Sequence, residues 1–146
     1  MFTINSKNYD IELTRGNSAE ICVTPFLEET LKPYELQDGD KVLFTVTNKS
    51  GGRIYLQKVV TNRDYDDEHN LILKIKPEDT INMKAADYYV YDLLLKTSDD
   101  AYTYVGKSST RKIIPKFVLA EAYGDIHYFY ADDENSDDIS GGEQNE

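Results

Sequence analysis

The sequence predicts an all-β domain, and three observations support that prediction. Short segments that alternate apolar and polar residues recur along most of the 146-residue chain, and this is the period of a half-buried strand. Turn-forming residues separate the segments roughly every ten residues. Pro33 breaks the only stretch with helical spacing, residues 28–36. About seven or eight short strands at this spacing are typical of a β-sandwich or a barrel.

The expected strands show either strict alternation or a run of β-branched and aromatic residues, and they cover residues 10–14, 19–24, 41–47, 53–61, 71–76, 88–95, 101–105 and 110–114. Arg15 to Ser18 supply the turn between the first two strands, and Pro25 ends the second. Asn48 to Gly52 are a strong turn signal. We therefore expect the strands on either side of this turn to form a hairpin.

The second half of the domain begins after an acidic loop. Pro77 to Thr80 predict a short helical turn or corner between two strands. Residues 88–95 are nearly all apolar, which predicts a strand buried on both faces in the middle of a sheet. We expect packing roles for most of the tyrosines in this region, with one of them bonding the backbone in the manner of a tyrosine corner. The candidates are Tyr88, Tyr89 and Tyr91.

The charge of the chain is unevenly distributed. There are 27 acidic and 16 basic side chains, for a formal net charge of -11. Residues 1–120 hold 18 acids and all 16 basic residues, a net of -2, whereas residues 121–146 hold nine acids and no Lys or Arg. Such a polar segment buries too little apolar surface to offset the entropy of ordering it. We therefore expect a β-sandwich domain over 1–120 and an acidic tail over 121–146 that is flexible unless bound.

Four aromatic residues border that tail: Tyr123, Tyr128, Phe129 and Tyr130. Exposed aromatic residues beside acids are typical of protein interfaces, so these four are the candidate partner-binding residues. The same segment could instead form one more strand that covers the sandwich. The acids beyond it also allow two interpretations. They could keep copies of the protein apart, or they could form an arm that orders on a basic partner surface.

No pattern in the sequence predicts catalysis. His69 lies in the acidic loop and His127 near the tail, and there is no Gly-x-Ser-x-Gly nucleophile elbow. The single cysteine, Cys22, excludes an internal disulfide and a thiolate zinc site. Its place within a strand predicts a small buried hydrophobic residue. We expect a non-enzymatic protein without catalytic residues or cofactors.

The acidic loop is the one segment with the composition of a metal site. Oxygen ligands stand there at alternate positions, at Asp64, Asp66, Glu68 and Asn70. Calcium requires several oxygen ligands on a flexible loop, but an EF-hand also needs Gly at its sixth position and Glu at its twelfth. His69 and Ile75 occupy those positions. We interpret the loop as a solvated tip and expect no metal, and a calcium site of another kind than an EF-hand is the alternative.

Composition also argues against membranes and nucleic acids as partners. No stretch approaches the ~20 apolar residues that span a bilayer. Residues 1–7 lack the basic patch and the long apolar segment of a signal peptide, so we expect no secretion signal. The one basic cluster lacks a net positive face, which makes it a weak signal for nucleic-acid binding. It consists of Arg111, Lys112 and Lys116.

Several segments together resemble a family of structural proteins of tailed phages and prophages, similar to the amino-terminal domain of siphophage baseplate upper proteins. They occur in the family's order over roughly residues 8–118. The matching segments are Ile11–Ala19, Tyr34–Asp40 leading into Val42–Val46, Lys76–Thr80 and Tyr89–Leu93. In the first of them, Asn17 and Ser18 replace the Asp-Thr of the family's turn.

The resemblance implies an immunoglobulin-like antiparallel β-sandwich that docks onto other virion proteins, and it implies no catalytic residues. We therefore expect a virion component of the baseplate, the tail or the head, present as a homo-oligomer or within a larger assembly. It would assemble in the bacterial host cytoplasm. The alternative is a small acidic phage inhibitor that mimics nucleic acid, which the net charge of -11 favours.

Overall fold

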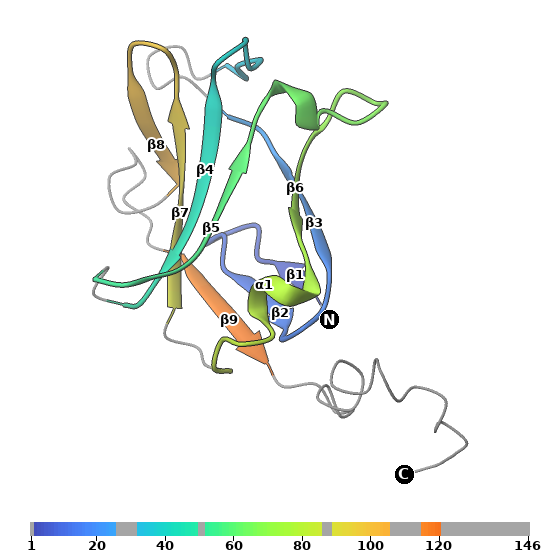
Figure 1. Cartoon of the computed structure of the whole chain (residues 1–146), viewed down its shortest axis with the longest axis vertical. Helices are drawn as coiled ribbons and strands as arrows, with labels where there is room; N and C mark the ends of the chain where they lie inside the picture. Colours follow the sequence, from blue (N-terminus) through green and yellow to red (C-terminus); the bar gives the residue numbers. More distant parts are fainter. Residues whose placement is uncertain (1, 26–31, 50–51, 86–88, 106–114, 121–146) are drawn as a thin grey trace.

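The computed structural model describes residues 2–25, 32–49, 52–85, 89–105 and 115–120. Strands dominate these residues, so the all-β prediction is confirmed (Figure 1). The strands are β1 Phe2–Ile4, β2 Ile11–Thr14, β3 Ala19–Val23, β4 Lys41–Thr47, β5 Ile54–Val60, β6 Leu71–Ile75, β7 Tyr89–Lys96, β8 Ala101–Val105 and β9 Lys116–Ala120. A short helix, α1 Pro77–Thr80, and a 3-10 turn, η1 Asn62–Asp64, complete the described elements.

The strands form two sheets. The larger sheet has the order β1-β2-β9-β7-β4-β5, and β8 also pairs with β7. Strand β7 is central, because β4 pairs with one of its edges while β9 and β8 share the other. Strands β3 and β6 form the second sheet.

One strand pair differs from the expected antiparallel arrangement. Strands β2 and β9 are parallel, and the other pairs among the described strands are antiparallel. Hairpin connections impose antiparallel pairing, but β2 and β9 lie at opposite ends of the domain sequence and no hairpin fixes their direction. The expectation of a wholly antiparallel sandwich is therefore wrong at this pair.

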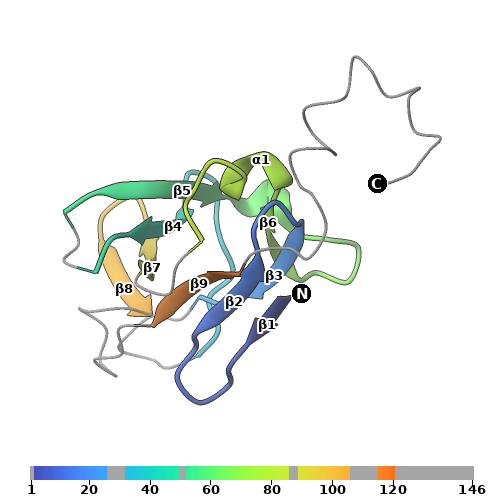
Figure 2. The ribbon, with the colours of Figure 1, turned by 90° about the horizontal axis from the view of Figure 1, so that it is seen from below.

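Both sheets contribute to a single hydrophobic core. Every second side chain of β7 is buried, and those between them are half-buried or exposed. Full burial on both faces of this strand, as expected from its apolar sequence, is therefore wrong for the outer face. The ring of Phe44 on β4 packs 5.3 Å from Tyr91 and 6.0 Å from Phe117, measured between ring centroids. Figure 2 shows β3 and β6 side by side, with β6 near the end of β5.

Most of the expected elements are present with small shifts of their ends. The expected helical turn at 77–80 is α1, and the expected hairpin is formed by β4 and β5. Strands β1 and β9 were not predicted, because β1 has only three residues and both strands pair with segments whose position only the fold determines. The expected strand at 110–114 lies outside the described residues.

Helix α1 is fixed at its start by Asp79. The carboxylate of Asp79 accepts a hydrogen bond from the backbone N–H of Lys76 at 2.8 Å, and Pro77 occupies the first turn, where its missing N–H costs nothing. The same carboxylate pairs with the ammonium of Lys58 on β5 at 2.9 Å. Both side chains of the ion pair are largely buried, so the pair attaches α1 to β5.

The other end of α1 is attached to the turn after β2. Thr80, which is fully buried, accepts a hydrogen bond from the N–H of Gly16 at 2.9 Å. The guanidinium of Arg15 donates to the carbonyl of Ile81 at 2.9 Å. The N–H of Arg15 donates to the carbonyl of Ala120 at 2.8 Å. The last residue of β9 therefore lies at the same corner as α1.

Two buried tyrosines of β7 bond the backbone. The hydroxyl of Tyr89 donates to the carbonyl of Lys84 at 2.8 Å, five residues upstream, which confirms the expected tyrosine-corner contact. The hydroxyl of Tyr91 donates to the carbonyl of Tyr9 at 2.5 Å. Burial, with a smaller contribution from the charge of Asp10, raises the pKa of Tyr91 above its usual value. Both phenols therefore hold their connecting segments against the core as neutral donors.

We expect Tyr89→Phe to lower the free energy of unfolding by about 1–2 kcal/mol, because it leaves the Lys84 carbonyl without this donor. Urea denaturation measures the change. Tyr55→Phe is the matched control, since the Tyr55 ring packs 4.9 Å from Tyr89 and its hydroxyl makes no hydrogen bond among the described residues. Equal stability of the Tyr89 variant and this control would contradict the contact.

Candidate functional site

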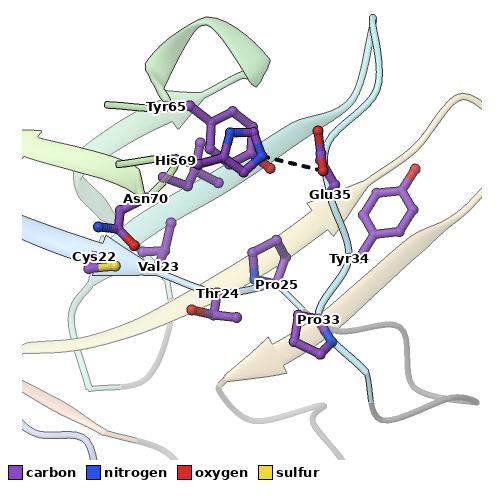
Figure 3. Close-up of a pocket in the computed structure, with 11 residues that line it drawn as sticks. Cys22, Val23, Thr24, Pro25, Pro33, Tyr34, Glu35, Tyr65, His69 and Asn70 are labelled. Carbon is purple, nitrogen blue, oxygen red and sulfur yellow. Dashed lines mark ion pairs between the residues drawn. The ribbon is translucent and has the colours of Figure 1, made fainter. Parts of the chain in front are cut away.

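A pocket of about 240 Å³ lies where β3 ends and β6 begins. It is smaller than the ~300–1,000 Å³ of typical small-molecule sites. Figure 3 shows Tyr65 and His69 along one wall and Pro25, Pro33 and Tyr34 along another. Five of the eleven lining residues carry rings, and Cys22, Thr24, Glu35 and Asn70 add polar side chains, so the lining mixes rings with polar groups.

The wall formed by Tyr65 and His69 belongs to the loop after η1. Tyr65 and His69 are stacked, with centroids 4.4 Å apart and planes 5° from parallel. The Nε2 atom of His69 lies 3.3 Å from Oε1 of Glu35, but both side chains are 63% exposed. An exposed ion pair of this kind contributes only ~0–1 kcal/mol. The hydroxyl of Tyr65 accepts a hydrogen bond from the N–H of Leu36 at 2.9 Å, so the pocket wall mainly connects the loop to the 33–37 segment.

The second wall is held by a buried carboxylate. Asp40 is 4% exposed, and its Oδ2 accepts hydrogen bonds from the hydroxyl of Tyr34 at 2.5 Å and from the N–H of Gln37 at 2.9 Å. The hydrogen bond to Asp40, supported by burial and by the Asp40 charge, raises the pKa of Tyr34 to about 12. Tyr34 is therefore a neutral donor that shields Asp40, not a reactive phenolate.

The acidic loop at 64–70 behaves as the predicted solvated tip. Its predicted oxygen ligands are exposed, and two of the carboxylates bond their own backbone. Asp66 accepts from the N–H groups of Glu68 and Asn70, while Asp64 accepts from that of Thr61. Within the described ranges there is no group of three or more His, Cys, Asp or Glu residues placed to hold a metal ion.

Cys22 is exposed, which corrects the expectation of a buried hydrophobic residue. The side chains of Ile21 and Val23 on either side face the core, so strand alternation turns Cys22 outward, opposite Ile72 of β6. Figure 3 shows Val23 and Asn70 between Cys22 and His69. The thiol and the imidazole therefore do not form a nucleophile–base pair.

The open edge of β5 is the described surface best suited to binding another chain. Strand β5 ends the larger sheet and runs for seven residues. Two of its apolar side chains face solvent, with Ile54 59% exposed and Val59 52% exposed. An edge of this length presents a row of backbone groups that can pair with an added strand. Sequence reasoning predicted the strand but not its place at an edge, which depends on non-local pairing.

The charge of the β4–β5 hairpin is also unlike that of the rest of the chain. Residues 41–60 contain four basic residues and no acid. Lys58 is paired with Asp79, whereas the other three basic side chains are exposed, at Lys41, Lys49 and Arg53. The guanidinium of Arg53 lies 4.7 Å from the centroid of the Tyr55 ring. The composition of this stretch could have identified the basic hairpin from the sequence, but the net charge of the chain obscured it.

The four candidate partner-binding residues, Tyr123, Tyr128, Phe129 and Tyr130, lie outside the described residues. The same holds for Arg111 and Lys112 of the basic cluster, while Lys116 is exposed on β9.

Among the described residues, no helix has the length and apolar character needed to cross a membrane. Comparisons with protein-family models, with curated proteins and with solved structures found no match to this chain.

We expect Asp40→Asn to return the pKa of Tyr34 from about 12 toward 10, because the acceptor charge is lost. Titration of the phenolate ultraviolet absorbance, with Tyr34→Phe identifying the signal, measures this change. The sign for stability follows from the raised value. The protonated Tyr34 stabilises the fold fully below about pH 10, where the phenol is protonated in both the folded and the unfolded chain. This stabilisation is lost as the pH rises through 12. An unchanged titration in Asp40→Asn would contradict the assignment.

We expect the folded protein to react with about one equivalent of a water-soluble disulfide reagent, because Cys22 is exposed. Absorbance of the released thiolate measures the reaction, and Cys22→Ser is the control that removes it. A thiol that reacts only after denaturation would restore the original expectation of burial.

Proposed function

We propose that this chain is a non-enzymatic docking module of a phage virion, built on an immunoglobulin-like β-sandwich. The open, apolar edge of β5 is the observation that carries the docking role. Backbone pairing at such an edge supplies affinity, and the side chains along it supply specificity.

Several features support the immunoglobulin-like arrangement. Counting from β2 as the first strand of that fold, the second pairs with the fifth as β3–β6, and the third pairs with the sixth as β4–β7. The sixth strand also pairs with the last, as β7–β9. The hydroxyl of Tyr89, near the start of β7, bonds the upstream backbone at Lys84, as in a tyrosine corner.

The virion assignment rests on the family resemblance of the segments between residues 8 and 118. It implies partners among other virion proteins, or other copies of the chain, in a baseplate, tail or head. Tyr123, Tyr128, Phe129 and Tyr130 remain the proposed partner-binding residues beyond the sandwich.

The alternative proposal, an acidic inhibitor that mimics nucleic acid, is favoured by one observation. The loop at 64–70 presents exposed carboxylates, and backbone hydrogen bonds hold those of Asp64 and Asp66. A mimic requires such fixed negative charges. Binding to host nucleases that falls steeply with salt, and that changes when residues 131–146 are deleted, would favour this alternative over docking.

The docking proposal predicts that the chain is present in purified particles of its phage and that particles lacking its gene are incomplete. Mass spectrometry of particles and negative-stain electron microscopy measure the two outcomes. In a gene-deletion background, we expect the double variant Ile54→Lys/Val59→Lys to be lost from particles, because charges on an edge strand oppose pairing. Both residues are exposed, so the fold should tolerate the change.

Ile4→Lys is the matched control, since Ile4 is 42% exposed on β1 at the opposite end of the larger sheet. Particles that are complete and fully infectious without the gene would overturn the virion assignment. Incorporation of the β5 double variant at the wild-type level would overturn the role of the β5 edge.

A further inference from the structure

We propose that the open edge of β5 pairs with the β5 edge of a second copy of this chain, antiparallel and about a twofold axis at Gln57. The inference rests on the proposed function, because it takes the β5 edge as the docking surface and names the partner. Such an interface is isologous, since each copy offers the same strand to the other. The larger sheet would then continue from one copy into the next.

A bulge in β5 places Ile54 on the outward face of the strand. Val46 and Thr47 are consecutive on β4, but they lie opposite Leu56 and Ile54, so Tyr55 is one residue more than regular pairing requires. The ring of Tyr55 packs against the hydrophobic core, whereas Ile54 is exposed. The bulge therefore shortens the spacing between Ile54 and the following outward side chains by one position.

The outward side chains of β5 are consequently symmetric about Gln57. Val59, which is exposed, stands two strand positions after Gln57, and the bulge leaves Ile54 two positions before it. In an antiparallel pair centred on Gln57, Ile54 of each copy would lie directly opposite Val59 of the other. Two apolar cross-strand pairs would then flank the axis and remove both exposed side chains from water.

The axis itself carries a group that can pair with its own copy. The side-chain amide of Gln57 is exposed and donates a hydrogen bond to Oγ1 of Thr45 at 2.9 Å. A primary amide also has a carbonyl oxygen and a second N–H, and two such amides can exchange hydrogen bonds. The neighbouring Lys58 is paired with Asp79 at 2.9 Å, so it brings no uncompensated charge to the interface.

The two ends of the β5 edge differ in charge, which favours antiparallel pairing of two copies. The turn end has the exposed Lys49 and Arg53, and residues 42–60 contain no acid. Residues 38–41 and 61–68, at the other end, hold six acids and two basic residues. Figure 1 shows the β4–β5 turn at one end of β5 and the segment that leads into β6 at the other. Antiparallel pairing brings the basic end of each copy beside the acidic end of the other.

A second copy fits this edge better than an unrelated strand does. It matches the symmetric spacing at both apolar positions and the charge at both ends, whereas another sequence would have to reproduce each feature separately. The net charge is not an obstacle at short range, because residues 1–120 carry a net of only -2. Repulsion between more distant charges is screened beyond ~8 Å at physiological ionic strength.

Sedimentation velocity of the full-length protein tests the proposal. We expect a reversible dimer at concentrations up to about 1 mM. Gln57→Lys and Gln57→Glu should each weaken the dimer about tenfold or more, because each places two like charges at the axis. An equimolar mixture of the two variants should restore dimerisation, since opposite charges then face each other. Thr3→Lys and Thr3→Glu are the matched controls that should remain dimeric, because Thr3 is exposed on β1 at the other end of the larger sheet.

Disulfide cross-linking tests the register. In a Cys22→Ser background, Gln57→Cys should give a covalent dimer on mild oxidation, because directly opposite residues have Cα atoms about 4.5–5.5 Å apart, within the range of a disulfide. Val59→Cys is the matched control on the same face of the strand. Its Cα would lie four positions, or about 13 Å, from its counterpart, which is too far for a disulfide.

A wild-type chain that stays monomeric at about 1 mM would overturn the proposal, and so would a mixture of the two Gln57 charge variants that fails to dimerise. Equal cross-linking of the Gln57→Cys and Val59→Cys variants would overturn the pairing about Gln57. None of these outcomes decides whether the chain is present in particles. If the dimer fails but the β5 double variant is still lost from particles, the docking proposal stands and another virion protein occupies the edge.

Discussion

Backbone pairing along β7 is the constraint on which the rest of the structure depends. Strand β4 occupies one edge of β7, and β9 and β8 divide the other, so the sheet can grow only outward from these neighbours. It ends at β1 on one side and at β5 on the other. The two ends are unequal, because β1 has three residues and β5 has seven. Short edges resist further pairing and long ones invite it. Strands β8, β3 and β6 also have one unpaired edge each among the described strands, but each has five residues, so β5 is the longest open edge that the arrangement leaves.

The corner around α1 holds that edge in place. Asp79 bonds both the start of α1 and Lys58 of β5, while Thr80 and Ile81 bond the turn after β2. These contacts connect a strand at the end of the sheet to segments at its far side, and they are largely shielded from water. An edge that is held in one conformation loses less conformational entropy when a partner strand is added. The same corner receives the end of β9, whose last residue, Ala120, accepts a hydrogen bond from the N–H of Arg15.

Local signals predicted most of the fold, and non-local ones decided the rest. The turn at Asn48 to Gly52 and the proline at Pro77 act within a few residues, and both were sufficient to predict the β4–β5 hairpin and α1. Strands β1 and β9 are defined by the strands beside them, which the sequence does not state. The prediction for Cys22 was wrong because it relied on the usual burial of cysteine. The alternation of side chains along the strand, with Ile21 and Val23 facing the core, points Cys22 toward solvent. The Tyr34–Asp40 bond depends on a burial that only the complete fold creates.

The distribution of charge determines what the β5 edge can accept. At physiological ionic strength, charges are screened beyond ~8 Å, so a strand approaching the edge meets mainly the local charges at the two ends of β5 and little of the net charge of the chain. A strand with a basic end at the turn is repelled by Lys49 and Arg53, whereas one with an acidic end there and an apolar centre is accepted. Repulsion of the wrong sequence contributes to specificity as much as attraction of the right one.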